Sequence, residues 1–187
     1  MAPMRLYLIR HPKPIVAANT CYGRSDLAVA QPEQARVAAA LLPLLPKGVP
    51  LFSSPLRRCA GLAQQLAGPL ACSPIRFDER LAEIDFGVWE GRSWDTIARA
   101  EIDAWADDMA GYRPGGGESV LQMAQRVCAF HAELMQSGPD CAIVICHAGT
   151  IRLLLAHRLG LTLPELALHA ARTPHAIDYG AVITLDG

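Results

Sequence analysis

Two histidines occupy matching positions, each at the end of a short apolar segment. Leu6–Ile9 is followed by Arg10 and His11, and Ala142–Cys146 is followed directly by His147. Both segments are rich in strand-forming residues, which is typical of buried parallel strands. If the two strands are neighbours, both imidazoles project into one crevice beyond the carboxyl ends of the strands. A single histidine at a strand end is most often structural, but two in matching positions favour a functional site.

The residues around these histidines suit chemistry at phosphorus. A neutral imidazole can attack phosphorus and form a phosphohistidine that water then hydrolyses. The reaction also needs cations to hold the nearly dianionic phosphate and an acid to protonate the departing alkoxide. Arginine suits the first role because its guanidinium is forked and permanently charged. The candidates in this chain are Arg10, Arg57 and Arg58 as cations and Glu83 and Asp85 as acids.

The composition is that of an ordinary globular domain. The chain has 187 residues, 51% of them hydrophobic and 19% charged, and a net charge of −1. We therefore expect a small-molecule partner, with no nucleic acid and no membrane partner, and a homodimer is left open. No segment indicates a signal peptide or a transmembrane helix. The six cysteines lack metal-site spacing, so we expect reduced thiols in a cytoplasmic protein with no metal and no other cofactor.

Apolar strands alternate with helical patterns along the chain. Strands are expected at residues 6–9, 49–52, 75–77 and 142–146, a hairpin within 176–185 around Gly180, and helices at 31–45, about 54–66, 118–135 and 150–159. Ser54 suits the N-cap of the second helix and Pro55 its first position. This order predicts one three-layer α/β domain over residues 1–187, with a mostly parallel sheet and helices on both faces. The middle segment, about 80–117, carries all three tryptophans and is expected to form a small helical cap over the site.

Four motifs in this order resemble those of the histidine phosphatase superfamily, which has the phosphoglycerate-mutase-like fold. The matching segments are Leu8–His11, Ser53–Cys59, Leu81–Gly91 and Cys146–Arg152. The resemblance implies that His11 is the nucleophile and that Glu83, rather than Asp85, is the proton donor. It also implies that phosphate is bound by Arg10, Arg58, His147 and the Ala148 N–H. Tyr22 and Arg24 follow the first motif and either line the entrance to the site or form a plain turn.

Within the superfamily, the chain looks most like the α-ribazole phosphatases. The likeness rests on Cys21–Asp26, Phe86–Gly91, Trp105 and Pro114–Ser119. It implies a metal-independent phosphomonoesterase acting on α-ribazole 5′-phosphate, or on a similar nucleotide-like ester, in cobalamin biosynthesis. The alternatives are a phosphoglycerate mutase, a broad-specificity sugar or nucleotide phosphatase, and a non-catalytic phosphate-binding protein. Pro12 stands where the common signature has glycine, which leaves the details of phosphate contact open.

Overall fold

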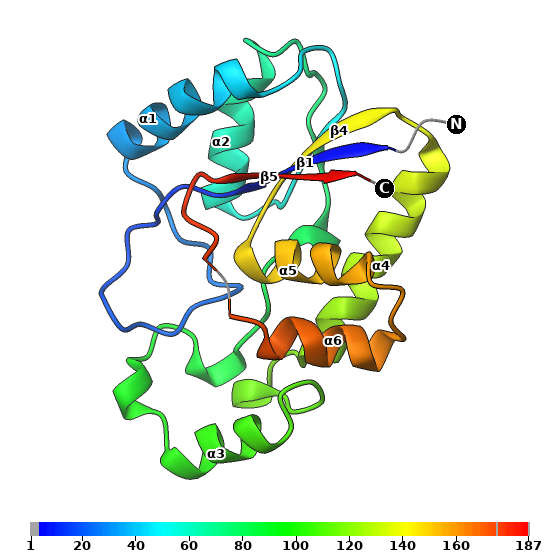
Figure 1. The fold of residues 1–187 in the computed structure, drawn as a ribbon. Helices are drawn as coiled ribbons and strands as arrows, with labels where there is room; N and C mark the ends of the chain where they lie inside the picture. The colour runs from blue at the N-terminus through cyan, green and yellow to red at the C-terminus, as the bar shows by residue number, and fades with distance from the viewer. Residues whose placement is uncertain (1–3, 175, 187) are drawn as a thin grey trace.

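A five-stranded sheet lies at the centre of the computed structural model, which describes residues 4–174 and 176–186 (Figure 1). The strands are β1 (Arg5–Arg10), β2 (Leu51–Ser53), β3 (Arg76–Phe77), β4 (Cys141–Cys146) and β5 (Val182–Asp186), in the order β3-β2-β4-β1-β5. All neighbouring pairs are parallel except β1 and β5. The predicted mostly parallel sheet is therefore confirmed, and the two strands that end in histidine, β1 and β4, are neighbours.

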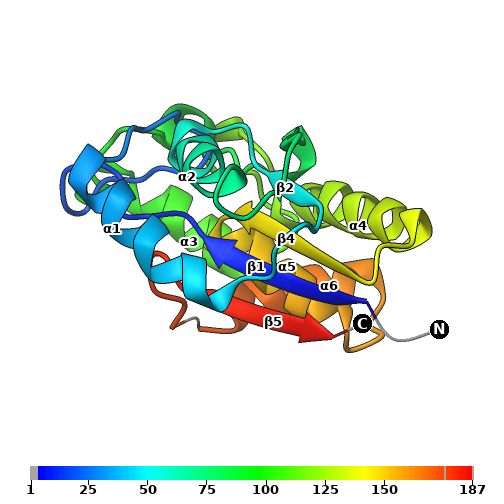
Figure 2. The same ribbon diagram turned by 90° about the horizontal axis from the view of Figure 1, so that it is seen from above.

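Helices cover both faces of this sheet (Figure 2). On one face, α1 (Gln31–Leu41) and α2 (Arg57–Ala67) pack against Ile9 and Ile145. On the other, α4 (Val120–Ser137), α5 (Ala148–His157) and α6 (Leu163–Arg172) pack against Leu8 and Val144. Successive strand residues thus enter opposite apolar cores, which explains why both strands are apolar throughout. The three-layer α/β fold agrees with the sequence prediction.

The middle segment contains one helix, α3 (Arg99–Asp107), which lies away from the strands, next to a series of short turns (Figure 1). The 3-10 turns are Glu79–Leu81, Gly87–Trp89, Trp94–Thr96 and Pro114–Gly116. Trp89 is fully buried and centres an aromatic cluster that includes Trp94 and Trp105. The loop after β1 is tied to this segment, because Cys21 N–H donates to Arg92 O and Trp94 N–H donates to Asn19 O. A small helical unit is present as predicted, and its role as a cap stays a prediction.

The start of α2 differs from the prediction. The helix begins at Arg57 with Leu56 at its N-cap, not at Ser54 and Pro55. Ser54 N–H donates to Ile145 O at 2.9 Å, so its backbone continues the pairing of β2 with β4. This tertiary contact overrides the local preference of serine for a helix N-cap.

The first helix and the C-terminal part of the chain also differ from the prediction. The first helix ends at Leu41 and tightens into a 3-10 turn over Leu42–Leu44, where Pro43 lacks the N–H of a helix interior. The hairpin around Gly180 is wrong, because β5 pairs with β1 instead of with the segment before it. Gly180 N–H donates to Arg10 O. This bond places the segment before β5 beside the end of β1, on the side that does not pair with β4. Helix α6 has no counterpart among the predicted elements.

Two further expectations concern the whole chain. All six cysteines are free thiols, and Cys141 and Cys146 lie within β4 as predicted. Among the helices of residues 4–174 and 176–186, none is long and apolar enough to cross a bilayer.

Candidate active site

The register of the sheet brings His11 and His147 together. Arg10 pairs with Cys146 at the ends of β1 and β4, and His11 N–H donates to Cys146 O at 3.1 Å. The two imidazole centroids are 5.0 Å apart. Both side chains are buried, at 3% exposure for His11 and 0% for His147. The two matching strand ends therefore bring both imidazole rings side by side.

Hydrogen bonds fix the tautomer of His11. Its Nδ1 lies 2.7 Å from Pro12 O, and a carbonyl can only accept, so Nδ1 carries the proton. Its Nε2 is then unprotonated and accepts from Arg58 Nε at 3.3 Å. Pro12, which replaces the common glycine, still supplies the carbonyl that orients the ring.

His147 faces the same donor from the other side. Its Nδ1 accepts from Arg58 Nε at 3.3 Å, and its Nε2 donates to Ser54 Oγ at 2.8 Å. His147 is the N-cap of α5, which begins at Ala148, two residues before the predicted start. Ala148 is buried beside His147 at this helix N-terminus, where backbone N–H groups favour anions.

Arg58 is completely buried, and its other hydrogen bonds go to backbone carbonyls. Nη1 donates to Ser25 O at 2.6 Å, and Nη2 donates to Gly23 O. The guanidinium is thus held by two carbonyls and two imidazoles, all of them neutral. Arg57 does not join it, because the Arg57 side chain is exposed. Its backbone N–H donates to Asp26 Oδ1.

Arg10 approaches the site through the C-terminal segment. Its Nη1 donates to Ile177 O at 2.5 Å, and its guanidinium carbon lies 3.9 Å from the centre of the Tyr179 ring. The Tyr179 ring is 5.6 Å from that of His11, and its hydroxyl is 2.7 Å from the Tyr22 hydroxyl. Tyr22 is therefore linked to His11 through Tyr179, and its place at an entrance stays a prediction.

Arg24, the other candidate for the entrance, contacts a surface acid and not the residues around the histidines. Its side chain pairs with the exposed Glu79 at 3.5 Å.

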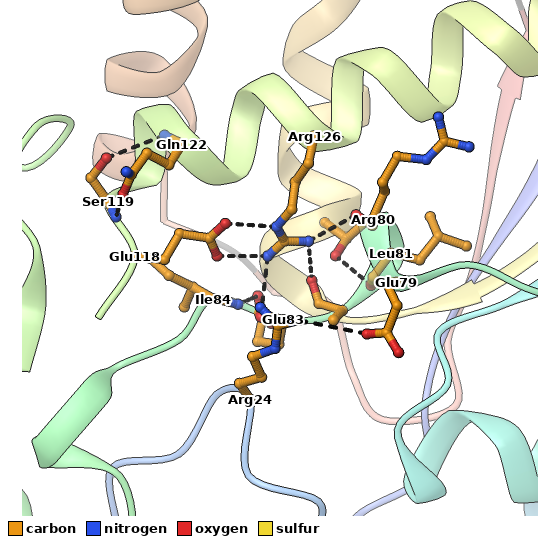
Figure 3. A network of polar contacts seen from close by, with 12 residues as sticks. Arg24, Glu79, Arg80, Leu81, Glu83, Ile84, Glu118, Ser119, Gln122 and Arg126 are labelled. Atoms are coloured by element: carbon orange, nitrogen blue, oxygen red, sulfur yellow. Dashed lines mark hydrogen bonds and ion pairs between the residues drawn. The ribbon is translucent and has the colours of Figure 1, made fainter. Parts of the chain in front are cut away.

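The backbone that carries Glu83 is anchored to α4 by Arg126 (Figure 3). Arg126 donates to the carbonyls of Arg80 at 2.8 Å, Ala82 at 2.6 Å and Glu83 at 3.2 Å. It also forms an ion pair with Glu118 at 2.7 Å, and both side chains are largely buried. This network fixes the segment on which the candidate acid stands.

The Glu83 carboxylate reaches the N-terminus of α5. Its Oε2 accepts from Gly149 N–H at 3.1 Å, and its Oε1 accepts from Ile84 N–H. Asp85, the other candidate acid, accepts from Gly87 N–H at 2.7 Å and stabilises a turn. Gly149 is two residues from His147, so of the two acids it is Glu83 that is tied directly to the histidine-bearing turn.

Comparison with known proteins assigns this arrangement to a family. The model of the histidine phosphatase superfamily (branch 1) matches residues 6–177. The chain belongs to this superfamily.

Relatives and solved structures agree with this assignment. A glucosyl-3-phosphoglycerate phosphatase of Mycolicibacterium vanbaalenii is 33% identical over 179 residues, covering 86% of this chain and 76% of the relative. A mycobacterial glucosyl-3-phosphoglycerate phosphatase complexed with VO3 superimposes with a TM-score of 0.80 at 26% identity, over 98% of this chain and 92% of the other. The α-ribazole phosphatase of Shigella flexneri gives the same TM-score and identity, over 98% and 90%. The chain is a phosphatase of the histidine phosphatase superfamily.

Three polar contacts of this histidine phosphatase were not expected from its sequence. Ser54 contacts His147, Tyr179 lies against Arg10, and Glu90 binds the loop whose carbonyls hold Arg58. Glu90 stands within the quoted motif Phe86–Gly91, which is the signal that could have found it. Tyr179 had no such signal, because its place depends on how β5 pairs.

A cavity of about 200 Å³ adjoins the acid of this phosphatase. Glu83, Gly149 and Arg152 are among the residues that line it. The rest of the wall is mostly apolar, from Phe86, Trp105, Met109, Val120, Met123 and Leu153. It is therefore an apolar space beside the candidate proton donor.

Both histidines of the phosphatase are held neutral. Burial, followed by the charges of Arg58 and Arg10, lowers the pKa of His11 from 6.5 to about 3. Burial and Arg58 also lower the pKa of His147 well below its usual value. An uncharged imidazole keeps a lone pair for attack, so the site preserves the nucleophilic form at neutral and moderately acidic pH.

These shifts predict how stability depends on pH. Between pH 6.5 and about 3, an unfolded His11 binds a proton that the folded residue does not, so stability falls as pH falls through this window. His11→Gln should therefore reduce the slope of unfolding free energy against pH by up to about 1.4 kcal/mol per pH unit. Urea titrations of wild type and variant across the window measure this slope. Equal slopes would contradict the neutral, buried state of His11.

Proposed function

We propose that this protein is a phosphomonoesterase that works through a phosphohistidine on His11. The observation that carries the proposal is the single Nε–H of Arg58 lying 3.3 Å from both His11 Nε2 and His147 Nδ1. A donor shared in this way keeps both ring nitrogens unprotonated and places a permanent positive charge beside the attacking atom. A phosphate dianion matches that charge, and Arg10 adds a second cation.

In the proposed reaction, His11 Nε2 attacks phosphorus and the bond from phosphorus to the ester oxygen breaks. Glu83 enters as the carboxylic acid and gives its proton to the departing alkoxide. In the second step Glu83, now a carboxylate, takes a proton from water while that water attacks phosphorus. The bond from phosphorus to nitrogen breaks, which releases phosphate and restores both groups. His147 and the Ala148 N–H contact the phosphoryl oxygens.

Trapping of the intermediate tests this assignment. Rapid acid-free quenching of wild type with a labelled phosphate ester should leave label on the protein, in an alkali-stable and acid-labile bond. His11→Ala should take up no label, because the attacking nitrogen is gone. His131→Ala, which removes a histidine on α4 outside the site, serves as the matched control and should label normally. Label that survives in the His11→Ala protein would show that another residue is the nucleophile.

The contact between Gly149 and Glu83 gives a second prediction. Glu83→Gln should lower kcat for alkyl phosphates by about 10²- to 10⁴-fold and for activated aryl phosphates by much less, because a good leaving group needs no proton. A Cβ at Gly149 would collide with Glu83 Oε1, so Gly149→Ala should show the same selectivity to a smaller degree. Gly68→Ala, where a Cβ meets open space, is the control. Equal losses on both kinds of ester would remove Glu83 from the role of acid.

For the substrate, we propose α-ribazole 5′-phosphate or a similar nucleotide-like ester. The mostly apolar cavity beside Glu83 supports this, because a planar base can bury apolar surface there while its phosphate lies at His11. The short path from Gly91 to Trp105 argues against a mutase, whose relatives in this superfamily generally carry a longer insertion after the acid motif.

A second candidate substrate is an ester whose alcohol carries a carboxylate, such as a glucosylated phosphoglycerate. Arg152 favours it, because its buried Nε has no hydrogen-bond partner among the residues that the structure describes and the residue borders the same cavity. The names of the mycobacterial relatives point to the same class.

Measured kcat/KM on both ester classes and on glycerol phosphate separates these candidates. Trp105→Ala should cost about tenfold or more for α-ribazole 5′-phosphate and little for glycerol phosphate, since it removes apolar wall. Met109→Ala checks the same wall without disturbing the aromatic cluster, and thermal unfolding shows whether each variant is folded. A dominant loss with Arg152→Met on the carboxylated ester would favour the second candidate. Isomerisation of phosphoglycerate that needs a bisphosphate primer would favour a mutase.

The remaining expectations about the cell stay predictions. These are a cytoplasmic location, a homodimer, and the absence of nucleic-acid and membrane partners.

A further inference from the structure

The carboxylate of Glu90 is surrounded by donors from the loop that follows the first histidine. Its oxygens accept from the backbone N–H groups of Gly23 at 3.0 Å, Arg24 at 2.8 Å and Ser25 at 3.0 Å. The Ser25 hydroxyl and Phe86 N–H donate to it as well. Three consecutive N–H groups around one anion form a compact anion-binding loop, and Glu90 supplies its anion from within the chain.

Charge and burial show how tightly Glu90 is held. It is half-buried, and burial by itself raises the pKa of its carboxyl. Bonds from the Ser25 side chain and from the backbone N–H groups of Gly23, Phe86 and Arg24 outweigh that effect, so the net shift of the pKa is downward. A carboxylate that accepts several N–H bonds is stabilised in its charged form. The negative charge of Glu90 is thus balanced by peptide dipoles instead of by a cation.

The same loop holds Arg58 on its opposite side. The peptide group between Gly23 and Arg24 donates its N–H to Glu90, and its carbonyl accepts from Arg58 Nη2. Ser25, whose N–H also binds Glu90, supplies the second carbonyl, at 2.6 Å from Arg58 Nη1. One peptide plane therefore lies between the carboxylate and the guanidinium, with its dipole oriented favourably towards both.

The loop has little freedom to find another arrangement. A Cβ at Gly23 would overlap Ile84 O, so the loop backbone rests directly on the segment that carries Glu83. Glu90 follows Trp89, which is fully buried in the aromatic cluster of the middle segment. A rigid cluster thus sets the position of the carboxylate, the carboxylate sets the loop, and the loop carbonyls direct Arg58 Nε to the two imidazoles.

We propose that Glu90 is a positioning residue for phosphoryl transfer and acts through Arg58, a role that rests on the proposed function of this site. It touches no reacting atom. Without its charge, the three N–H groups lose their common acceptor and the loop carbonyls no longer define one position for the guanidinium. Glutamine cannot replace it, because its NH₂ group would face the N–H donors that the second carboxylate oxygen accepts from.

A double-mutant cycle on kcat/KM with an activated aryl phosphate tests this coupling. Glu90→Gln in the wild-type background should lower kcat/KM by about 10- to 100-fold, because a small displacement of a charged group has effects of this size. In the Arg58→Met background the same change should cost less than about threefold, because its target is already gone. Glu101→Gln is the matched control: it lies in α3, contacts Trp89 Nε1, and should leave kcat/KM near the wild-type value.

A merely structural role would give a different result. Equal fold-losses from Glu90→Gln in both backgrounds, or a lower Tm with unchanged kcat/KM, would overturn the proposal. Ser25→Ala removes only one of the loop's bonds to Glu90 and should give a smaller loss that also disappears in the Arg58→Met background, which keeps the test valid if Glu90→Gln folds poorly.

Titration with inorganic phosphate separates this proposal from the proposed function. If wild type binds phosphate but turns over no ester, the proposed function fails, and the same cycle on phosphate affinity decides the role of Glu90. A wild type that neither binds phosphate nor turns over an ester would overturn both.

Discussion

A fully buried guanidinium with neutral partners is the constraint on which this site depends. Burying a charge without compensation is very unfavourable, so Arg58 requires acceptors for its N–H groups. A carboxylate would be the strongest acceptor, but it would neutralise the charge that a phosphate needs. Two carbonyls and two imidazoles instead satisfy Arg58 and leave its charge unpaired. The site can therefore attract a dianion, because no carboxylate within residues 4–174 and 176–186 pairs with Arg58.

The carboxylates close to the site are held away from Arg58 by backbone N–H groups. Glu83 accepts from Gly149 N–H, and Glu90 accepts from the loop after β1, whose peptide dipoles stabilise the negative charge of Glu90. The fold thus keeps opposite charges separate within a small volume. Burial and the charge of Arg58 keep both histidines neutral, and the separation preserves this state because a carboxylate beside either ring would favour the imidazolium. The Arg58 guanidinium, the neutral His11 imidazole and the Glu83 carboxyl can then act on one substrate without forming ion pairs with one another.

The residues predicted from sequence are those fixed by local context. His11 and His147 end apolar strands, and a parallel sheet brings such ends together whatever the loops do. Ser54 shows where local reasoning fails: its sequence favours a helix N-cap, but pairing of its N–H with Ile145 O turns its hydroxyl to His147. Tyr179 reaches Arg10 only because the C-terminal segment joins the free edge of β1. The hairpin prediction missed this, since strand partners distant in sequence leave no local pattern.

In the proposed function, one set of elements binds the phosphate of the ester and another binds its alcohol. In the proposed reaction, the groups around the phosphorus come from the ends of β1 and β4, the start of α2 and the loop bound to Glu90. The wall of the apolar cavity comes from the middle segment and from α4, α5 and α6. Glu83 belongs to both, since it borders the cavity and binds the turn after His147. Changes in the wall can therefore alter which alcohol is accepted without altering the Arg58 contacts. If Glu83 is the acid, selectivity for the alcohol and the chemistry at phosphorus meet at this side chain, because the proton donor must contact the ester oxygen.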